Sequence, residues 1–323
     1  MPSLLEEFAA IREGVGLAVL PDAILRFKGA DAREMLQGAL SNDMKTLQSG
    51  KGIAALHLTP KGKWVAALKL FELENAIWAH TSLAEAKALP EALKNLILFS
   101  QTELSDLSEE NEWILGVGKE ALNFASEMFR FDPERLPLSH QTVIVDGLSV
   151  EVMRDFDWSD FPAFLLLLPR TYESRIRPTL TELSTPYPVA WIGEETLKAL
   201  RIEAGRPFYG VDIDEGTIPQ EANVEEGFIS YTKGCYVGQE TISRVKHYGR
   251  VHKRLAKLGG KEAFPENASL FFDGKEVGKV TSASRSLTSE GWVALSLLPS
   301  LLATKGTSLE LKIDSFRQAV TVL

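Results

Sequence analysis

The hydrophobic pattern changes character near Arg254, and this change constrains the fold more than any other feature of the chain. Before Arg254, strand-like runs alternate with segments in which apolar residues recur at helical spacing. After it, the pattern is all-β, and Asp273-Gly274 joins two short runs as a two-residue hairpin turn. We therefore predict an α+β part that is followed by a small C-terminal β-barrel or sandwich.

The α+β part contains two successive units in which strands and helices are mixed. Asp31, with Glu34 three residues later, is typical of a helix-starting capping box, and Pro90 is expected to interrupt a helix. We expect helices at 3–12, 32–40, 83–99, 119–129, 172–183, 194–204 and 238–246. Strands are expected at 17–20, 24–28, 53–58, 64–73, 77–80, 113–117, 142–152 (a hairpin) and 163–168.

Length and composition describe an ordinary globular protein. The chain has 323 residues, of which 45% are hydrophobic and 24% charged, and this length favours two or three domains. No apolar run approaches a membrane span, and the first ten residues lack the basic and apolar segments of a signal peptide. A single cysteine excludes an internal disulfide and fits a reducing compartment. We expect a cytoplasmic protein that does not enter membranes.

That cysteine, Cys235, lies in the segment Lys-Gly-Cys-Tyr-Val-Gly-Gln-Glu at residues 233–240. The two glycines permit a tight loop, and a helix is expected to begin near Gly238. A neighbouring cation, Lys233, and a helix N-terminus both favour thiolate over thiol. The chemistry alone leaves two interpretations open, a reactive thiol and a small buried hydrophobic side chain.

This octapeptide resembles the signature of the YgfZ-type folate-binding proteins, which are paralogues of the glycine-cleavage T-protein, an aminomethyltransferase. The resemblance extends to Leu-Arg-Ile-Glu-Ala-Gly-Arg-Pro at 200–207, to 212–215 and 218–222, and near the N-terminus to 27–31, 36–38 and 41–43. It covers the chain from about residue 17 to residue 255, and is weaker beyond.

The resemblance implies a three-lobed T-protein-like fold with two ferredoxin-like, split α+β lobes and a C-terminal small β-barrel. We predict a discontinuous folate-binding lobe at 1–50 and 137–245, which carries the octapeptide, an inserted α+β lobe at 51–136, and the barrel at 246–323. Folate would bind in the channel where the lobes meet.

The acidic pair that serves the T-protein is missing here. The stretch after the expected hairpin turn reads Lys-Gly-Lys-Trp-Val-Ala-Ala-Leu at 61–68, so Ala66 and Ala67 take the acidic positions. Alanine cannot exchange a proton or pair with an amine, so we expect no glycine-cleavage activity. The alternative is an acid supplied from elsewhere, such as Asp43 or Glu72.

Glu203 is the first candidate for folate binding, because a carboxylate can accept two hydrogen bonds from the 2-amino-pyrimidine edge of a pterin. The resemblance supports this role, although its position alone is that of an ordinary helix glutamate. The expected cofactor is tetrahydrofolate or a one-carbon derivative. The remaining expected contacts are Asn42, Asp43, Tyr209, Gln220, Gln239 and Arg244. The functional thiol would be Cys235, with Lys233 beside it.

The charge of the chain is uneven. Its net charge of −9 argues against indiscriminate nucleic-acid binding. Cations nevertheless gather after the octapeptide and form a basic stretch at 244–254. This stretch is either a solvated surface or an anion site for RNA phosphate or a polyglutamate tail. The residues concerned are Arg244, Lys246, His247, Arg250, His252, Lys253 and Arg254. No metal site is expected from this chain alone, because a four-cysteine cluster would need three ligands from elsewhere.

Three functions remain open at this point. The first is a folate-binding accessory protein that assists assembly or repair of iron–sulfur enzymes and indirectly affects tRNA modification. Its partners would be iron–sulfur assembly or client proteins, and Cys235 would act directly, by transient ligation or by one-carbon or sulfur chemistry. The second is a folate-dependent one-carbon transferase with an unknown substrate. The third is a non-catalytic binding module that senses folate and contacts a partner through the loop around Cys235. Turnover of a methylene-folate donor separates the second from the others, and Cys235→Ser separates the third from the first.

Overall fold

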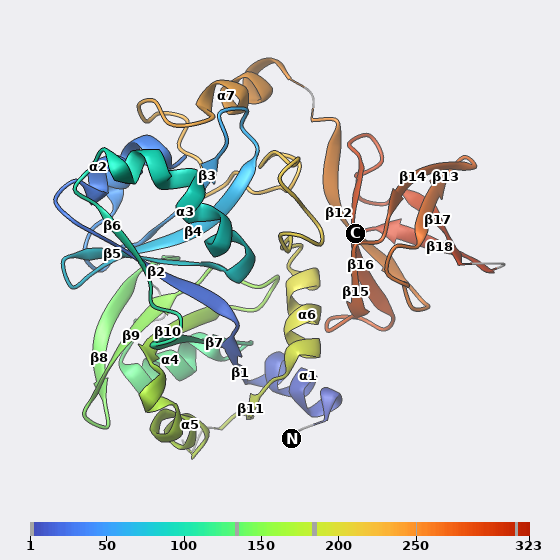
Figure 1. Cartoon of the computed structure of the whole chain (residues 1–323). Coiled ribbons are helices and arrows are strands. Elements are labelled where there is room, and N and C mark those ends of the chain that lie inside the picture. Colours follow the sequence, from blue (N-terminus) through green and yellow to red (C-terminus); the bar gives the residue numbers. More distant parts are fainter. Residues whose placement is uncertain (1–2, 133–135, 183–185, 250, 314–315) are drawn as a thin grey trace. The chain divides into compact units, whose positions relative to one another are not determined.

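The computed structural model describes residues 3–132, 136–182, 186–249, 251–313 and 316–323 (Figure 1). Its contacts divide the chain into two units, and each contains segments that are distant in the sequence. Unit 1 comprises Met1–Ile192 and Glu226–Glu240, and unit 2 comprises Gly193–Glu225 and Thr241–Leu323. Leu183, the last residue expected in one helix, and Arg250 lie outside the described residues.

The first sheet of unit 1 is antiparallel and has the strand order β3-β4-β5-β2-β6. The long β3–β4 hairpin forms where the sequence predicts it, because two apolar runs flank the turn at residues 59–63. The helices α2 (Ala32–Ala39) and α3 (Leu83–Leu98) belong to the same part of the chain. The strands are β2 (Asp22–Lys28), β3 (Ile53–Leu58), β4 (Trp64–Leu73), β5 (Ala76–Ser82) and β6 (Glu103–Asp106).

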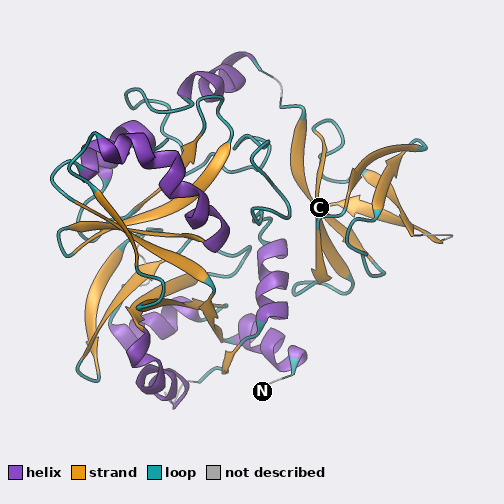
Figure 2. Cartoon of the chain, viewed as in Figure 1, coloured by secondary structure: helices purple, strands orange, loops and turns teal. Residues whose placement is uncertain are grey.

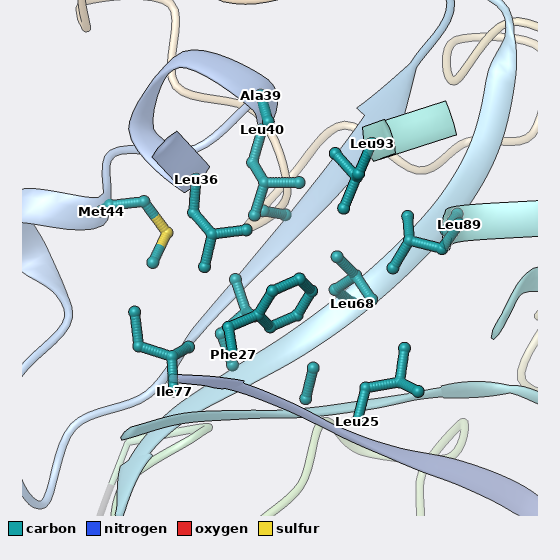
Figure 3. Close-up of a cluster of buried hydrophobic side chains, with 14 of the residues drawn as sticks. Leu25, Phe27, Leu36, Ala39, Leu40, Met44, Leu68, Ile77, Leu89 and Leu93 are labelled. Atoms are coloured by element: carbon teal, nitrogen blue, oxygen red, sulfur yellow. The ribbon is translucent and has the colours of Figure 1, made fainter. Parts of the chain in front are cut away.

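The core of this part lies between the sheet and the two helices. Figure 3 shows Leu36 of α2 and Leu89 of α3 directed toward Phe27 and Leu68 of the strands, and all four side chains are completely buried. Each such side chain contributes about 1.5–3 kcal/mol through its removal from water. The alternation of apolar residues in β2 and β4 therefore directs one sheet face toward α2 and α3.

The second sheet of unit 1 has the order β11-β1-β7-β10-β9-β8, in which β1 and β11 are parallel and the other pairs antiparallel. A second core of aromatic and aliphatic side chains packs between it and its helices, and Figure 2 shows the ribbons of both. The strands are β1 (Val15–Leu20), β7 (Asn111–Val117), β8 (His140–Val145), β9 (Leu148–Arg154), β10 (Ala163–Pro169) and β11 (Val189–Trp191). The helices are α1 (Leu4–Glu13), α4 (Ala121–Phe129) and α5 (Glu173–Glu182).

Unit 2 contains α6 (Glu194–Glu203), most of α7 (Gln239–Tyr248) and a seven-stranded antiparallel sheet that curls into a half-barrel (Figure 2). Its strand order is β14-β13-β17-β18-β12-β16-β15. The strands are β12 (Lys253–Gly260), β13 (Ser269–Phe272), β14 (Lys275–Lys279), β15 (Ser282–Arg285), β16 (Trp292–Pro299), β17 (Ser308–Ile313) and β18 (Phe316–Val322). The predicted α+β class with an all-β C-terminal part is therefore confirmed.

Sheet membership does not follow sequence position. Strand β2 precedes residues 51–136 yet pairs with β5 and β6, whereas β7 lies within that range and belongs to the other sheet of unit 1. The residue limits predicted for the three lobes stay a prediction.

Two local expectations are wrong. Asp31 stands at the N-terminus of α2 but forms no side-chain cap, because its carboxylate instead accepts a hydrogen bond from the amide of Gln101 at 2.8 Å. Pro90 does not interrupt its helix. The helix continues through it because Leu89 and Leu93 on either side are both held in the core.

His57 makes the end of α2 sensitive to pH. The ring is buried and its Nδ1 lies 3.0 Å from the carbonyl oxygen of Ala39, and burial lowers the pKa of His57 below its usual value of 6.5. A lowered folded-state pKa means that the contribution to stability is present above about pH 6.5 and is lost as the pH falls through the folded-state value.

We therefore expect urea unfolding to show a larger loss of stability between pH 7.5 and 5.5 for the natural chain than for His57→Gln, which keeps a donor but does not titrate. The difference is limited to about 1.4 kcal/mol per pH unit. Equal losses in the two proteins would show that His57 does not control this pH dependence.

Candidate functional site

The loop that carries Cys235 is anchored to the segment that follows α2. We call residues 227–238 the signature loop. The amide of Asn42 donates to the carbonyl of Gly227 at 2.8 Å, and the hydroxyl of Ser41 donates to the carbonyl of Phe228 at 2.7 Å. Near the other end, the Val237 N–H donates to the carbonyl of Gly38 at 3.2 Å. Segments nearly two hundred residues apart are thus joined at both ends of the loop.

Lys233 provides the central attachment. Its Nζ donates to the carbonyl oxygens of Gln37, Leu40 and Asn42 at 2.6, 2.7 and 2.9 Å. Two of these carbonyls lie in the last turn of α2 and its C-terminal cap, where a cation is favoured by the helix dipole. Burial lowers the pKa of Lys233 to about 8, and the carboxylate of Asp43 opposes this shift.

These contacts give Lys233 an anchoring role, in which its ammonium is directed into α2. They bring Lys233, expected beside the thiol, together with Asn42 and Asp43, two of the expected folate contacts. The activation of the thiol by Lys233 stays a prediction.

The thiol itself is exposed. Cys235 is a free, exposed cysteine, whereas the residues on either side of the Gly234-Cys235 pair, Lys233 and Tyr236, are buried. The Lys233 ammonium lies 5.3 Å from the centre of the Tyr236 ring, and burial raises the pKa of Tyr236 to about 12. The chain therefore presents one thiol to solvent on a loop whose neighbouring side chains are fixed in unit 1.

Gly238 closes the loop against the β3–β4 hairpin. Its φ of +85° is disfavoured for residues with a side chain, and an added Cβ would lie 2.6 Å from the carbonyl oxygen of Thr59 and 3.2 Å from the Cα of Gly62. Gly234 differs, because its φ is not positive and nothing lies within 4 Å of an added Cβ. Of the two glycines in the octapeptide, the fold therefore requires a glycine only at position 238.

The hairpin that contacts Gly238 carries no acid at the expected positions. Ala66 and Ala67 lie in β4, and the neighbouring carboxylate of Glu85 accepts hydrogen bonds from the Trp64 indole at 2.7 Å and the Ala67 amide at 3.0 Å. This buried carboxylate also caps α3. Sequence reasoning missed its contacts, although the motif Ser-Leu-Ala-Glu at 82–85 is a recognisable capping box.

The two alternative acids are engaged elsewhere in unit 1. Glu72 forms a salt bridge with Arg33 at 2.8 Å. The carboxylate of Asp43 accepts a hydrogen bond from the Lys45 amide at 3.1 Å and caps a short 3₁₀ turn. Both contacts have an evident structural role.

Glu203 lies in unit 2 at the end of α6 and is 3% exposed. Its Oε1 accepts hydrogen bonds from the Ser286 hydroxyl at 2.6 Å, the Leu287 amide at 3.0 Å and the Thr288 hydroxyl at 3.3 Å. The Nζ of Lys257 lies 3.6 Å from Oε2. To bind the Glu203 carboxylate, a pterin would therefore have to displace hydrogen-bond donors of residues 286–288, which belong to unit 2 itself. The local sequence gave no signal for this contact, because Ser286 is 83 residues away.

The other expected folate contacts are distributed over both units. Gln239 begins α7 in unit 1, whereas the exposed Arg244 lies further along that helix in unit 2. Tyr209 is half-buried in unit 2. Gln220 is buried, and its amide donates to the carbonyl of Ile242 in α7 at 3.3 Å. Their role in binding stays a prediction.

A further pair in unit 2 was not singled out from the sequence. Arg201 and Asp212 form a buried salt bridge at 2.5 Å, and Asp212 also accepts hydrogen bonds from the Phe208 amide and the Thr281 hydroxyl. This network holds the turn that follows α6. The sequence feature that could have pointed to this salt bridge is Asp212, the first acidic residue of the Asp-Ile-Asp-Glu segment at 212–215.

Metal-binding clusters and membrane-spanning helices are both absent from the described residues. Over the ranges given above, no group of three or more histidine, cysteine, aspartate or glutamate side chains is arranged to hold a metal ion. Within the same ranges, none of the helices is both long enough and apolar enough to cross a membrane.

Comparisons with known proteins place this arrangement in a family. The GCVT N-terminal domain matches residues 1–233, and the glycine cleavage T-protein C-terminal barrel domain matches residues 253–323. Among solved structures, the glycine cleavage system aminomethyltransferase T of Bartonella henselae superposes with a TM-score of 0.85. It is 21% identical in sequence, and the match covers 98% of this chain and 87% of that one. The three-lobed T-protein fold is thereby confirmed.

Curated relatives give a narrower assignment. The tRNA-modifying protein YgfZ of an Enterobacter strain is 30% identical over 260 residues, which cover 78% of this chain and 74% of that protein. The protein of the same name from Blochmanniella pennsylvanica is 26% identical over 79% of this chain and 74% of its own length. A chloroplastic protein of Arabidopsis thaliana, named as a "putative transferase", is 27% identical over 291 residues. The match covers 88% of this chain but only 65% of the length of that relative. The chain belongs to the glycine-cleavage T-protein superfamily as a YgfZ-type paralogue.

The two glycines of the signature loop supply a matched test. Gly238→Ala should destabilise the protein by about 1–3 kcal/mol, because it combines a positive φ with a clash against the hairpin backbone. Gly234→Ala should change stability by no more than about 0.5 kcal/mol, as exposed substitutions usually do. Denaturant unfolding of both variants measures the difference. Equal effects would mean that Gly238 does not anchor the loop.

Proposed function

We propose that this protein is a tetrahydrofolate-binding accessory protein for the assembly or repair of iron–sulfur enzymes, and that it affects tRNA modification through those enzymes. The observation that carries the proposal is the exposed thiol of Cys235 on a loop anchored by Lys233 and Gly238. Its membership of the YgfZ branch, whose curated relatives are named tRNA-modifying proteins, supports the connection to tRNA.

The anchored loop suits a thiol that acts on a partner molecule. An exposed cysteine can form a transient bond to a metal, a sulfur atom or a one-carbon unit without unfolding the protein. Because the neighbouring Lys233 and Tyr236 are buried, the loop is held close to the thiol while the thiol itself stays open to solvent. The partner we propose is an iron–sulfur assembly or client protein, which would supply the remaining ligands of any cluster.

Glycine cleavage is not part of the proposed function. Alanine at 66 and 67 offers no proton-transferring group, and the nearby carboxylate of Glu85 is buried and engaged with Trp64 and Ala67.

We therefore expect no ammonia release above the background rate when the protein is supplied with the aminomethyl-lipoyl carrier protein and tetrahydrofolate. An authentic T-protein assayed in parallel is the positive control. Turnover comparable to that control would show that another acid, such as Asp43 or Glu72, serves the reaction.

Folate binding is proposed to involve Glu203. Glu203→Ala should weaken tetrahydrofolate binding by about 1.5–3 kcal/mol, the scale of a hydrogen bond to a charged group. Isothermal titration calorimetry measures the effect directly. An unchanged dissociation constant would remove Glu203 from the binding site.

Ser286→Ala is the matched control, since it removes one donor from Glu203 without removing the carboxylate. If the carboxylate binds the pterin, this variant should retain the affinity of the natural chain or exceed it, because a competing donor is gone. A loss as large as that of Glu203→Ala would mean that the 286–288 segment, and not the carboxylate, controls binding.

Cys235→Ser tests the accessory role. It should abolish the support of iron–sulfur enzyme activity in a host that lacks the natural gene, while the free energy of unfolding changes by no more than about 0.5 kcal/mol because the side chain is exposed. Gly234→Ala alters the same loop but keeps the thiol, and it should complement fully. Complementation by Cys235→Ser would contradict the proposed role of the thiol, and the protein would then be a folate-binding module without thiol chemistry.

A further inference from the structure

We propose that a cleft in unit 2 binds single-stranded RNA, with one unpaired base in the cleft and the adjoining phosphates on its basic rim. This goes beyond the proposed function, in which tRNA is affected only through other enzymes. The cleft has a volume of about 710 Å³, and its lining residues are Gln220, Glu225, Val245, Lys246, Gly249, Val251, His252, Arg254, Pro299, Ser300 and Leu301. It is formed entirely within unit 2.

The basic rim comes from the stretch that follows the signature loop. Lys246 on α7, His252 before β12 and Arg254 at the start of β12 line the cleft, and all three are exposed. Glu225 is the acid among the lining residues. Among the described residues, no carboxylate forms a salt bridge with His252 or Arg254. Arg254 therefore offers its positive charge to a ligand.

The cleft also has an apolar lining, which argues for a base in addition to a phosphate. Val245, Val251, Pro299 and Leu301 line it, and Leu301 is 89% exposed. Such a wall gives no advantage to an isolated phosphate or carboxylate, whereas it can cover the face of a nucleobase. Histidine rings and arginine guanidinium planes are groups on which unpaired bases stack in RNA-binding proteins, and His252 supplies the first of these.

Gln220 adds a hydrogen-bonding group from the buried side of the cleft. Its side chain is 2% exposed, and its Nε2 donates to the carbonyl of Ile242. Its Oε1 has no hydrogen-bond partner among the described residues. A buried acceptor without a donor is costly, by about 1–3 kcal/mol, and a base amino group or a ribose hydroxyl could satisfy it after a small side-chain rearrangement.

Hydrogen bonds join residues 252–255 to the segments at 220–225 and 299–301. The Ser300 N–H donates to the carbonyl of His252 at 2.9 Å, and the Leu255 N–H donates to the carbonyl of Glu221 at 2.7 Å. The Asn223 amide donates to the carbonyl of Leu255 at 2.8 Å. Since the walls are joined in this way, binding requires little ordering of the chain, which favours affinity.

The test is fluorescence anisotropy of a labelled single-stranded RNA of about ten nucleotides, which is a typical length for such sites. The natural chain should bind it with salt-dependent affinity. Lys246→Glu combined with Arg254→Glu should weaken binding about tenfold at low salt, and the slope of log affinity against log salt should flatten by about 0.7 for each phosphate that the variant no longer neutralises. The same strand without bases should bind about fivefold less tightly.

Lys275→Glu combined with Lys279→Glu is the matched control, because it makes the same two charge reversals at exposed positions of the β13–β14 hairpin in the same unit. It should bind RNA like the natural chain. The proposal is overturned if the natural chain does not bind RNA, if the Lys275→Glu, Lys279→Glu control weakens binding as much as the cleft variant, or if tri-γ-glutamate binds the cleft and RNA does not. Since folate is absent from this assay, its outcome is separate from that of the folate experiments.

Discussion

The ammonium of Lys233, donating to three carbonyl oxygens at the end of α2, is the interaction on which the signature loop depends. Burying a charge is costly unless it is fully hydrogen-bonded, and here each of the three ammonium protons has an acceptor. Charge-assisted hydrogen bonds and the negative end of the helix dipole offset that cost. The same carbonyls would lack donors without the lysine, so helix end and loop stabilise each other.

The end of α2, which accepts these hydrogen bonds, is itself fixed by packing in the core of unit 1. Leu36, Ala39 and Leu40 are completely buried against the first sheet of unit 1 (Figure 3). His57 of β3 contacts the Ala39 carbonyl. The loop is therefore attached to a core and not to a mobile surface segment. Because Gly238 closes the other end against the β3–β4 hairpin, Cys235 stands exposed between two fixed points. This arrangement supports a role in which the thiol reacts with an incoming partner.

Much of the fold could be predicted from the sequence, because most elements have a strong local pattern. The hairpin over 53–73, the Asp273-Gly274 turn and the helix after the signature loop all formed where apolar spacing and turn residues indicated. Predictions were wrong where a distant partner overrode a local rule. Asp31 fits a capping box by spacing alone, but its carboxylate binds the Gln101 amide, 70 residues away.

The candidate site could be predicted only in part, for the same physical reason. The octapeptide identified the exposed thiol, yet no local pattern shows that Lys233 contacts residues 37–42 or that Glu203 is occupied by residues 286–288. A cation next to a cysteine in sequence suggests activation of the thiol, whereas in the fold that cation is directed into a helix end. The two glycines look equivalent in sequence and differ in backbone angle and surroundings.

Hydrogen exchange of the Val237 amide, which donates to the Gly38 carbonyl, tests the anchoring by Lys233 most directly. Lys233→Met should accelerate exchange of this amide at least about tenfold, the equivalent of one net hydrogen bond, because the loop would separate from α2. Lys61→Met, an exposed lysine in the nearby β3–β4 turn, should leave the rate unchanged. An exchange rate in Lys233→Met equal to that of the natural chain would contradict the account.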